Sequence, residues 1–522
     1  MKTPKTGRSW NPLSDKSDVV ARAAASAAGV VAMVLAAAFF TLPSQAGAAA
    51  EPTVVGELQG EAMRMAYGSG TVVNESGATA LKLHSAGARA TGTITASAAV
   101  SGVRITARGT QCAGAPRIRI LLNGALALVT NVASTTFTAY TSSFVKPAGT
   151  YTVTAKLMNY TKTAQCARTV SLDAVLLTGT STPTTTTPPG SGSFAAFGSA
   201  TVTADFLATG AGNNVDTIAF WEAPTPAESR MYVTSKNLSL VEVWKYPYAS
   251  AADQQTPLTH SCLKASSDSA TNGVLVDQES DLLYVASNFS PNVCVFSLPG
   301  LTHVKTITSG ASYGLEPNLA MITLPTGHKR LYVSNNSIVY VHDPVTGAKL
   351  SQFTPTKGLE AMWGDNHDQV LYIPDENTRT GVYAYHPDGT PYTRNGKTVL
   401  GNSTIFDSDG EGIVEYTCPA SGVGDDGTGL IVVSDQIDSS STGNDYEVFD
   451  RRSWAYLGKI KMRLPTGGYV YNTDGIASTQ QSSPHYPGGV LTAIHDDSSV
   501  AGVSWDKILR AISTQTGTTF GC

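Results

Sequence analysis

A short apolar segment that ends in polar residues recurs six times in the second half of the chain. The copies start about 40 to 60 residues apart and occupy residues 231–237, 283–288, 331–336, 371–376, 431–436 and 491–496. Apolar runs of this length between turn residues are typical of buried β-strands. In four copies a second strand-like run follows, as at residues 240–244 and 381–385. Six such units predict a six-bladed β-propeller over residues 196–522, and two stacked sandwiches are the alternative.

A polar residue that opens a small apolar run precedes each copy by about 11 to 20 residues. These six residues are Asp216, Asn272, Glu316, Glu360, Glu411 and Asp474. The first strand of each propeller blade borders the central channel, so we expect the six side chains to form a ring. Asp375, Glu376, Asp409 and Asp496 should lie near that ring.

Carboxylates gathered in this way repel one another unless a cation binds them or their pKa values rise. Ligands that are all oxygen atoms favour a hard cation, and Ca²⁺ accepts six to eight of them with flexible geometry. The repeat therefore predicts a calcium site at the channel. The alternative is that each acid only caps a turn.

The first half of the chain also has a β pattern. Alternating runs occur at residues 90–96, 103–108 and 151–157, between segments that contain Gly, Asn and Pro. The chain has 49 Gly and 26 Pro, as expected for a protein rich in turns. Residues 51–180 therefore predict a β-sandwich. A Thr, Pro and Gly-rich stretch at 181–195 predicts an extended linker, so the predicted fold is all-β.

The first fifty residues have the order of a secretory signal. A polar, basic stretch precedes an apolar run at about 23–42, and small residues follow at 46–50. We therefore predict that residues 1–50 are a signal peptide and that the mature protein is secreted and extracellular. An uncleaved membrane anchor is the alternative.

Export permits disulfide bonds, and the six cysteines occur two by two. Six cysteines allow fifteen pairings. Our hypothesis is three sequential pairs: Cys112 with Cys166, Cys262 with Cys294, and Cys418 with Cys522.

Charge and motifs exclude several classes of function. The formal net charge is −5, and no cluster of Lys and Arg is present. We therefore expect no nucleic-acid partner, and no membrane partner once the signal is removed. Neither a Walker loop nor a G-x-S-x-G nucleophile elbow is found. Closed propellers are self-sufficient folding units, so we expect a monomer.

Part of the first domain resembles the calcium-dependent xylan-binding carbohydrate-binding modules. The resemblance lies in residues 109–116, 118–124, 159–161 and 166–173. It implies that this domain binds polysaccharide; a sandwich that serves only as a spacer is the alternative. In those modules, carboxylates in the loop around the second cysteine help to bind calcium. Here that loop has Tyr160 and Ala167, and Asp173 remains.

Residues 196–522 resemble the β-propeller phytases, which are secreted calcium-dependent phosphatases that act on inositol hexakisphosphate. The resemblance lies in residues 201–205, 216–221, 234–237, 358–366 and 371–376. It is most specific in residues 409–414, 433–436, 446–451, 473–476, 486–489 and 503–508. It implies calcium ligands at Asp216, Glu360, Glu376, Asp409, Glu411 and Asp474. It also implies a phosphate contact from Lys236 and catalytic roles for Lys236, Glu360, Asp409 and Glu411. The implied partner is an inositol phosphate or another small anion.

The chain departs from the phytase pattern at several positions. The residue after Asp216 is Thr217, where the family has a second Asp. Phe289 stands where the family has a phosphate-binding Arg, and Asn335 or Asn336 stands where it has a Lys. Because these changes remove cations, the sequence also supports an alternative function. That alternative is a carbohydrate-active propeller, either a glycan hydrolase or a lyase, or a glycan-binding protein without phosphatase activity.

Overall fold

The structure is a computed structural model. It describes residues 53–517 except 113, 124, 147, 180–193, 210–213, 224, 265–269, 310–311, 315, 325–327, 336, 357–358, 360, 377–378, 419–424 and 426. The predicted signal peptide, most of the predicted linker, Glu360, Asn336 and Cys522 therefore lie outside the described residues.

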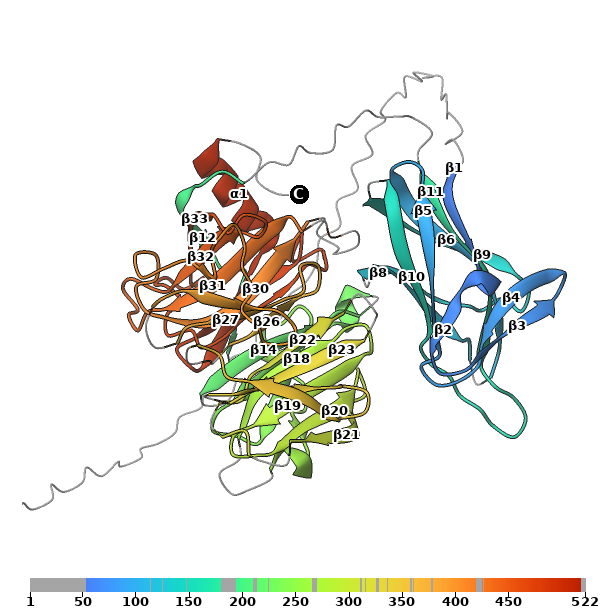
Figure 1. The fold of residues 1–522 in the computed structure, drawn as a ribbon, viewed down its shortest axis with the longest axis horizontal. Helices are drawn as coiled ribbons and strands as arrows, with labels where there is room; N and C mark the ends of the chain where they lie inside the picture. Colours follow the sequence, from blue (N-terminus) through green and yellow to red (C-terminus); the bar gives the residue numbers. More distant parts are fainter. Residues whose placement is uncertain are drawn as a thin grey trace, which may run out of the picture. The chain divides into compact units, whose positions relative to one another are not determined.

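The N-terminal part consists of two β-sheets (Figure 1). The first has the order β3–β4–β11–β6–β9, and β1 also pairs with β11. Its strands are β1 (Thr53–Gln59), β3 (Gly70–Glu75), β4 (Ala78–Leu83), β6 (Val100–Thr110), β9 (Thr138–Lys146) and β11 (Thr169–Gly179). The second sheet has the order β2–β5–β10–β7–β8. Its strands are β2 (Arg64–Tyr67), β5 (Arg89–Ala96), β7 (Arg117–Leu122), β8 (Ala125–Asn131) and β10 (Gly149–Leu157).

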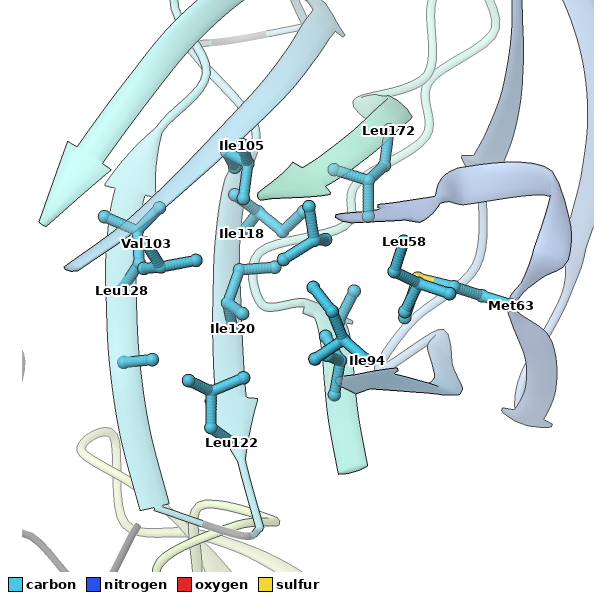
Figure 2. Packing of buried hydrophobic residues seen from close by; sticks show 14 of the residues in the cluster. Leu58, Met63, Ile94, Val103, Ile105, Ile118, Ile120, Leu122, Leu128 and Leu172 are labelled. Atoms are coloured by element: carbon cyan, nitrogen blue, oxygen red, sulfur yellow. The ribbon is translucent and has the colours of Figure 1, made fainter. Parts of the chain in front are cut away.

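These two sheets share one hydrophobic core. Alternate residues of β6, such as Val103 and Ile105, are buried together with Ile94 of β5 and Ile118 of β7 (Figure 2). A period of two places one face of each strand in the core, as the alternating sequence runs predict. The three strands predicted from those runs correspond to β5, β6 and β10.

Six further sheets follow, each with a first strand, a nearly fully buried second strand and a third strand in antiparallel order. The first sheet contains β14 (Val215–Trp221), β15 (Arg230–Ser235), β16 (Leu240–Lys245) and β17 (Leu258–Thr259). The second contains β18 (Thr271–Asp277), β19 (Leu282–Ser287), β20 (Asn292–Ser297) and β21 (Thr302–Thr308), and the third contains β22 (Leu319–Thr323), β23 (Lys329–Ser334), β24 (Val339–His342) and β25 (Lys349–Phe353). The fourth contains β26 (Trp363–Asp365), β27 (Val370–Pro374), β28 (Val382–Tyr385) and β29 (Val399–Leu400). The second strands match the recurring apolar segments of the sequence.

The last two sheets each take a strand from the N-terminal side of this region. The fifth sheet contains β30 (Asp409–Thr417), β31 (Gly429–Gln436), β32 (Asp445–Asp450), β33 (Tyr456–Arg463) and β12 (Gly198–Thr203). The sixth contains β34 (Ile476–Thr479), β35 (Val490–His495), β36 (Ser499–Ser504) and β13 (Phe206–Thr209). Strand β12 runs parallel to β33, and β13 runs antiparallel to β36. Backbone hydrogen bonds thus join the beginning of this region to its end.

The first strands of the six sheets contact one another in the order β14, β18, β22, β26, β30 and β34, and β34 contacts β14 again. The first five of these strands are labelled in Figure 1. Glycine permits the close approach. A Cβ atom at Gly475 would lie 2.3 Å from the carbonyl oxygen of Asp216, and one at Gly412 would lie 2.8 Å from the backbone nitrogen of Ile476. The Gly that follows Asp474 and Glu411 is therefore required by packing between neighbouring sheets.

Where the first strands end, side-chain amides join the first sheet to the second and the fifth sheet to the sixth. Gln278 accepts a hydrogen bond from the backbone N–H of Glu222 at 2.8 Å and donates one to its carbonyl at 2.5 Å. Gln480 makes the same pair of bonds with the backbone of Thr417, both at 3.0 Å. Each amide therefore satisfies the last backbone groups of the preceding first strand, as a neighbouring strand would.

Ion pairs join other neighbouring sheets at that end. Lys329 Nζ of the third sheet lies 2.5 Å from Asp277 Oδ1 of the second. Arg451 Nη2 of the fifth sheet lies 2.6 Å from Asp365 Oδ1 of the fourth, and both side chains are buried. Because Asp365 also accepts the backbone N–H groups of His367 and Asp368, the pair fixes the turn after β26.

Two of the predicted disulfides are confirmed, Cys112–Cys166 and Cys262–Cys294. Cys418 is also disulfide-bonded, and its predicted partner Cys522 lies outside the described residues. The described part of the chain contains one α-helix, α1 (Trp505–Thr516), which packs on β12 and β36 through Trp505 and Ile508. In the part of the chain that the structure describes, no helix has the length and apolar character needed to cross a membrane. The coarse prediction of a β-rich chain is confirmed.

The packing between first strands can be tested at Gly475. We expect Gly475→Ala to lower the free energy of unfolding by about 1–3 kcal/mol, because its Cβ would displace the backbone of Asp216. Gly300→Ala is the matched control, since the nearest atom to its Cβ would be Thr302 Oγ1 at 3.9 Å. Urea unfolding monitored by tryptophan fluorescence measures both. Equal stability of the two variants would contradict this account of the ring.

Candidate functional site

The ring of first strands encloses a cavity of about 670 Å³. Its wall is mainly apolar in the middle and is lined by residues from all six sheets, namely Ile218, Val274, Leu319, Met362, Ile413 and Ile476. Glu411 and Asp474 line the same cavity. Acids from different repeats therefore reach one shared space.

Three carboxylates converge on one ammonium group at the end of the cavity where the first strands begin. Lys236 Nζ lies 3.1 Å from Glu316 Oε1, 3.2 Å from Asp474 Oδ2 and 3.4 Å from Asp216 Oδ1. The three acids belong to the third, sixth and first sheets. We call this group the Lys236 cluster. It brings together residues that are 258 positions apart, from 216 to 474.

Two side-chain hydrogen bonds and one backbone hydrogen bond position the Lys236 cluster. Asp216 is the second residue of β14, and its Oδ2 accepts a bond from the Thr217 hydroxyl at 2.9 Å. Lys236 follows β15, and its backbone N–H donates to the carbonyl of Asn214 at 2.7 Å. Gln436 donates to Asp474 Oδ1 at 2.7 Å. The acids are thus held by elements of the sheets themselves rather than by long loops.

The protonation of these acids is shifted by their surroundings. Burial raises the pKa of Asp216 to about 7, although Lys236 opposes this rise, and Asp474 adds to it. Burial also raises the pKa of Asp474. Asp497, which faces Asp474, has a pKa of about 6, mainly because of burial. Burial and the neighbouring acids together thus outweigh the effect of Lys236 on the pKa of these carboxyl groups.

A second group of acids lies where the fourth and fifth sheets begin. The pKa of Asp409 is raised by burial and by Asp375, while Arg379 lowers it. Arg379 is exposed and adopts a left-handed backbone conformation with φ +54°. Glu411, two residues after Asp409, is buried, and Glu376 follows β27 in a half-buried position. Arg379 is thus a cation beside a predicted calcium ligand.

The structure brings together some of the predicted site residues. Asp216 and Asp474 meet at Lys236, and Glu411 shares the cavity with Asp474. Glu360 lies outside the described residues. The contact between Lys236 and three acids was not predicted, nor were the contributions of Arg379, Gln436 and Asp497. Gln436 closes a recurring apolar segment, so the repeat contained a signal for its position.

The chemistry of the donors fits a hard cation, because the acids of this site offer carboxylate oxygens and already surround a positive charge. Within the described residues, His260, Cys262 and His303 form a group whose possible metal-ligand atoms all lie within 4.8 Å of one another. This group lies apart from the Lys236 cluster in the sequence and shares no residue with it. Cys262 is in a disulfide there. Asp216, Glu316 and Asp474 instead lie around Lys236 Nζ.

The N-terminal part has its own acidic position. Asp173 of β11 has a pKa raised by burial and by the nearby acids Glu61 and Glu57. The backbone register shifts between Leu172 and Ala174, which places Asp173 at a β-bulge. Tyr160 packs against the hydrophobic core of the two N-terminal sheets.

No protein-family model matches this chain, and no curated protein matches it. Among solved structures, the Neurospora crassa Pan2 WD40 domain is 10% identical, with a TM-score of 0.36, over 56% of this chain and 90% of that one. A CBM36-1 domain of a xylanase from a Trinervitermes trinervoides hindgut metagenome is 12% identical, with a TM-score of 0.21, over 24% of this chain and 98% of that one. A carbohydrate-binding module CBM36 in complex with calcium and xylotriose is also 12% identical, with a TM-score of 0.20. These scores are low, and the strand pairing of this chain defines its fold.

The raised pKa of Asp216 predicts a pH dependence of stability in calcium-free buffer. The folded state holds this proton more tightly than the unfolded chain, whose value is near 3.8, so stability is lost as pH rises from about 4 through 7. We expect Asp216→Asn to reduce this loss, because the buried group no longer ionises. Thermal unfolding between pH 4 and 8 in the presence of EDTA measures it. An unchanged pH slope in the variant would refute the assignment.

Proposed function

We propose that the chain is a secreted, calcium-dependent, phytase-like phosphomonoester hydrolase that acts on inositol phosphates such as inositol hexakisphosphate. The observation on which this proposal rests is the convergence of Asp216, Glu316 and Asp474 on Lys236 at the end of a closed ring of strands. The six sheets are then the blades of a six-bladed propeller, with the acids at its channel mouth. The two N-terminal sheets are a β-sandwich that binds polysaccharide.

The proposed ligands of calcium are Asp216, Glu360, Glu376, Asp409, Glu411 and Asp474. When bound, calcium would neutralise phosphate charge and make a bound water easier to deprotonate. Carboxylate oxygens are suitable donors for this ion. Asp409 and Glu411 lie at the start of the fifth sheet, and Asp474 of the Lys236 cluster lies before the first strand of the sixth. These residues would hold the ion.

Lys236 is the residue of this chain placed to bind a phosphate oxygen as a point charge. In the hydrolysis, the oxygen of water attacks phosphorus, and the bond from phosphorus to the ester oxygen breaks. The ester oxygen leaves as the alcohol with a proton from water, and orthophosphate is released. A carboxylate of this site can accept the proton of the attacking water and return it to the ester oxygen.

Phosphate release from inositol hexakisphosphate tests the proposal. We expect release in the presence of Ca²⁺, its loss with EDTA, and at least a hundredfold lower kcat for Glu411→Ala, because a buried ligand is removed. Asp388→Asn, in the loop after β28, is the matched control and should keep wild-type activity. Absence of phosphate release from the wild-type chain at every pH would exclude the proposal.

The exposed Phe289 favours a second candidate function, a carbohydrate-active or glycan-binding propeller. Its ring is 46% exposed at the same end of the propeller as the Lys236 cluster. A panel of neutral and acidic glycans, assayed for new reducing ends and unsaturated products, tests hydrolase and lyase activity. A response in this panel without phosphate release would favour this candidate.

Polysaccharide binding by the N-terminal module has its own test. We expect the full chain to be depleted from solution by insoluble xylan, and EDTA to change this binding less than twofold, because Tyr160 and Ala167 offer no carboxylate. Albumin in the same assay controls for non-specific adsorption. Complete release by EDTA would show that calcium is required after all, and no depletion would exclude xylan as the partner.

A further inference from the structure

Phe289 is an unusual residue for its position. It lies in the turn between β19 and β20, with φ +53° and 46% of its surface exposed. The left-handed region is costly for a bulky side chain and is normally taken by Gly, Asn or Asp. Exposing the ring gives no compensating burial. Backbone strain kept at a rim position is a reason to look for a function of the side chain.

The backbone around Phe289 is tied to the Lys236 cluster. The N–H of Phe289 donates to the carbonyl of Gly314 at 2.7 Å, and the side-chain oxygen of Asn288 accepts the backbone N–H of Glu316 at 2.7 Å. Asn288 itself is buried, and its N–H donates to the carbonyl of Ala270 at 2.8 Å. Phe289 is therefore fixed beside the residue whose carboxylate lies 3.1 Å from Lys236 Nζ.

The charge at this end of the channel limits how many phosphates a substrate can bring. Among the described residues, Lys236 lies against Asp216, Glu316 and Asp474, and Arg379 lies near Asp409. These four acids outnumber the two cations. Each further phosphate on a substrate adds up to two negative charges that must be neutralised in the same space. Phe289, in contrast, offers a surface that favours an apolar face.

We propose that Phe289 stacks on the ring of the substrate and that the preferred substrates are ring phosphomonoesters with one or two phosphates. This inference rests on the proposed phosphomonoester hydrolysis. In such molecules one face of a pyranose or cyclitol ring presents C–H groups that can lie on an aromatic ring. Inositol hexakisphosphate has a phosphate on every ring carbon, which crowds both faces.

The test uses the full chain and three substrates, glucose 6-phosphate, glycerol 3-phosphate and inositol hexakisphosphate. We expect Phe289→Gly to lower kcat/KM for glucose 6-phosphate about threefold to tenfold, as expected for loss of one aromatic contact. Hydrolysis of glycerol 3-phosphate, which has no ring, should stay within twofold. Phe289→Trp should keep wild-type activity toward glucose 6-phosphate.

Folding is controlled separately. Glycine suits the left-handed conformation, so Phe289→Gly should have a thermal midpoint equal to or above that of the wild type. Val345→Ala, at an exposed apolar residue in the turn between β24 and β25, is the matched control and should leave all three activities unchanged.

The outcomes separate this inference from the proposed function. Equal effects of Phe289→Gly on glucose 6-phosphate and glycerol 3-phosphate, or no effect on either, would overturn the stacking role. Faster turnover of inositol hexakisphosphate than of glucose 6-phosphate would overturn the substrate preference. If the wild type releases phosphate from none of the three, the proposed function fails. Saturation-transfer NMR with glucose 6-phosphate then decides the role of Phe289: ring-proton signals lost in Phe289→Gly support it, and unchanged signals refute it.

Discussion

The close approach of six first strands around one cavity is the constraint on which the rest of the structure depends. Gly412 and Gly475 allow neighbouring strands to come into contact, because any larger residue would meet backbone atoms of the next sheet. Each of these glycines directly follows an acid, Glu411 or Asp474. At both positions, the glycine that lets two neighbouring strands touch is preceded by an acid at the start of a first strand.

The far end of the ring shows how the sheets are held together without continuous strand pairing. Neighbouring first strands diverge there, and the backbone groups of Glu222 and Thr417 would lose partners. Gln278 and Gln480 supply those partners from the next sheet. Buried ion pairs such as Arg451 with Asp365 join other neighbours. A buried polar group without a partner is costly, so these contacts specify which sheets lie side by side.

The opposite end accumulates negative charge for the same geometric reason. Asp216, Glu316 and Asp474 lie at or just before the first strands of three repeats, and the ring of strands brings them to Lys236. Lys236 offsets part of the repulsion through three contacts of 3.1 to 3.4 Å. The pKa values of Asp216 and Asp474 are nevertheless raised, mainly by burial and also by neighbouring acids. This group of carboxylates is the reason for proposing a calcium site here.

Much of this arrangement could be predicted from the sequence because it repeats. The apolar second strands lie where the recurring segments predict them, and the sequential pairing of the cysteines predicted two of the disulfides. Lys236 lies in the first recurring segment, but no other copy has a Lys there, and Arg379 follows the fourth copy, so the repeat does not predict their neighbours. The strain at Phe289 was also hidden, because a left-handed φ angle depends on the turn between β19 and β20 and not on the residue type.

We propose that acids from distant repeats bind one shared calcium ion. Calorimetric calcium affinity of Asp216→Asn, Asp474→Asn and the double variant tests it most directly. If the two carboxylates serve one ion, their effects are coupled, and the double variant differs from the sum of the singles by more than about 0.5 kcal/mol. Effects that add within that margin, or calcium affinity that neither variant changes, would contradict a shared site.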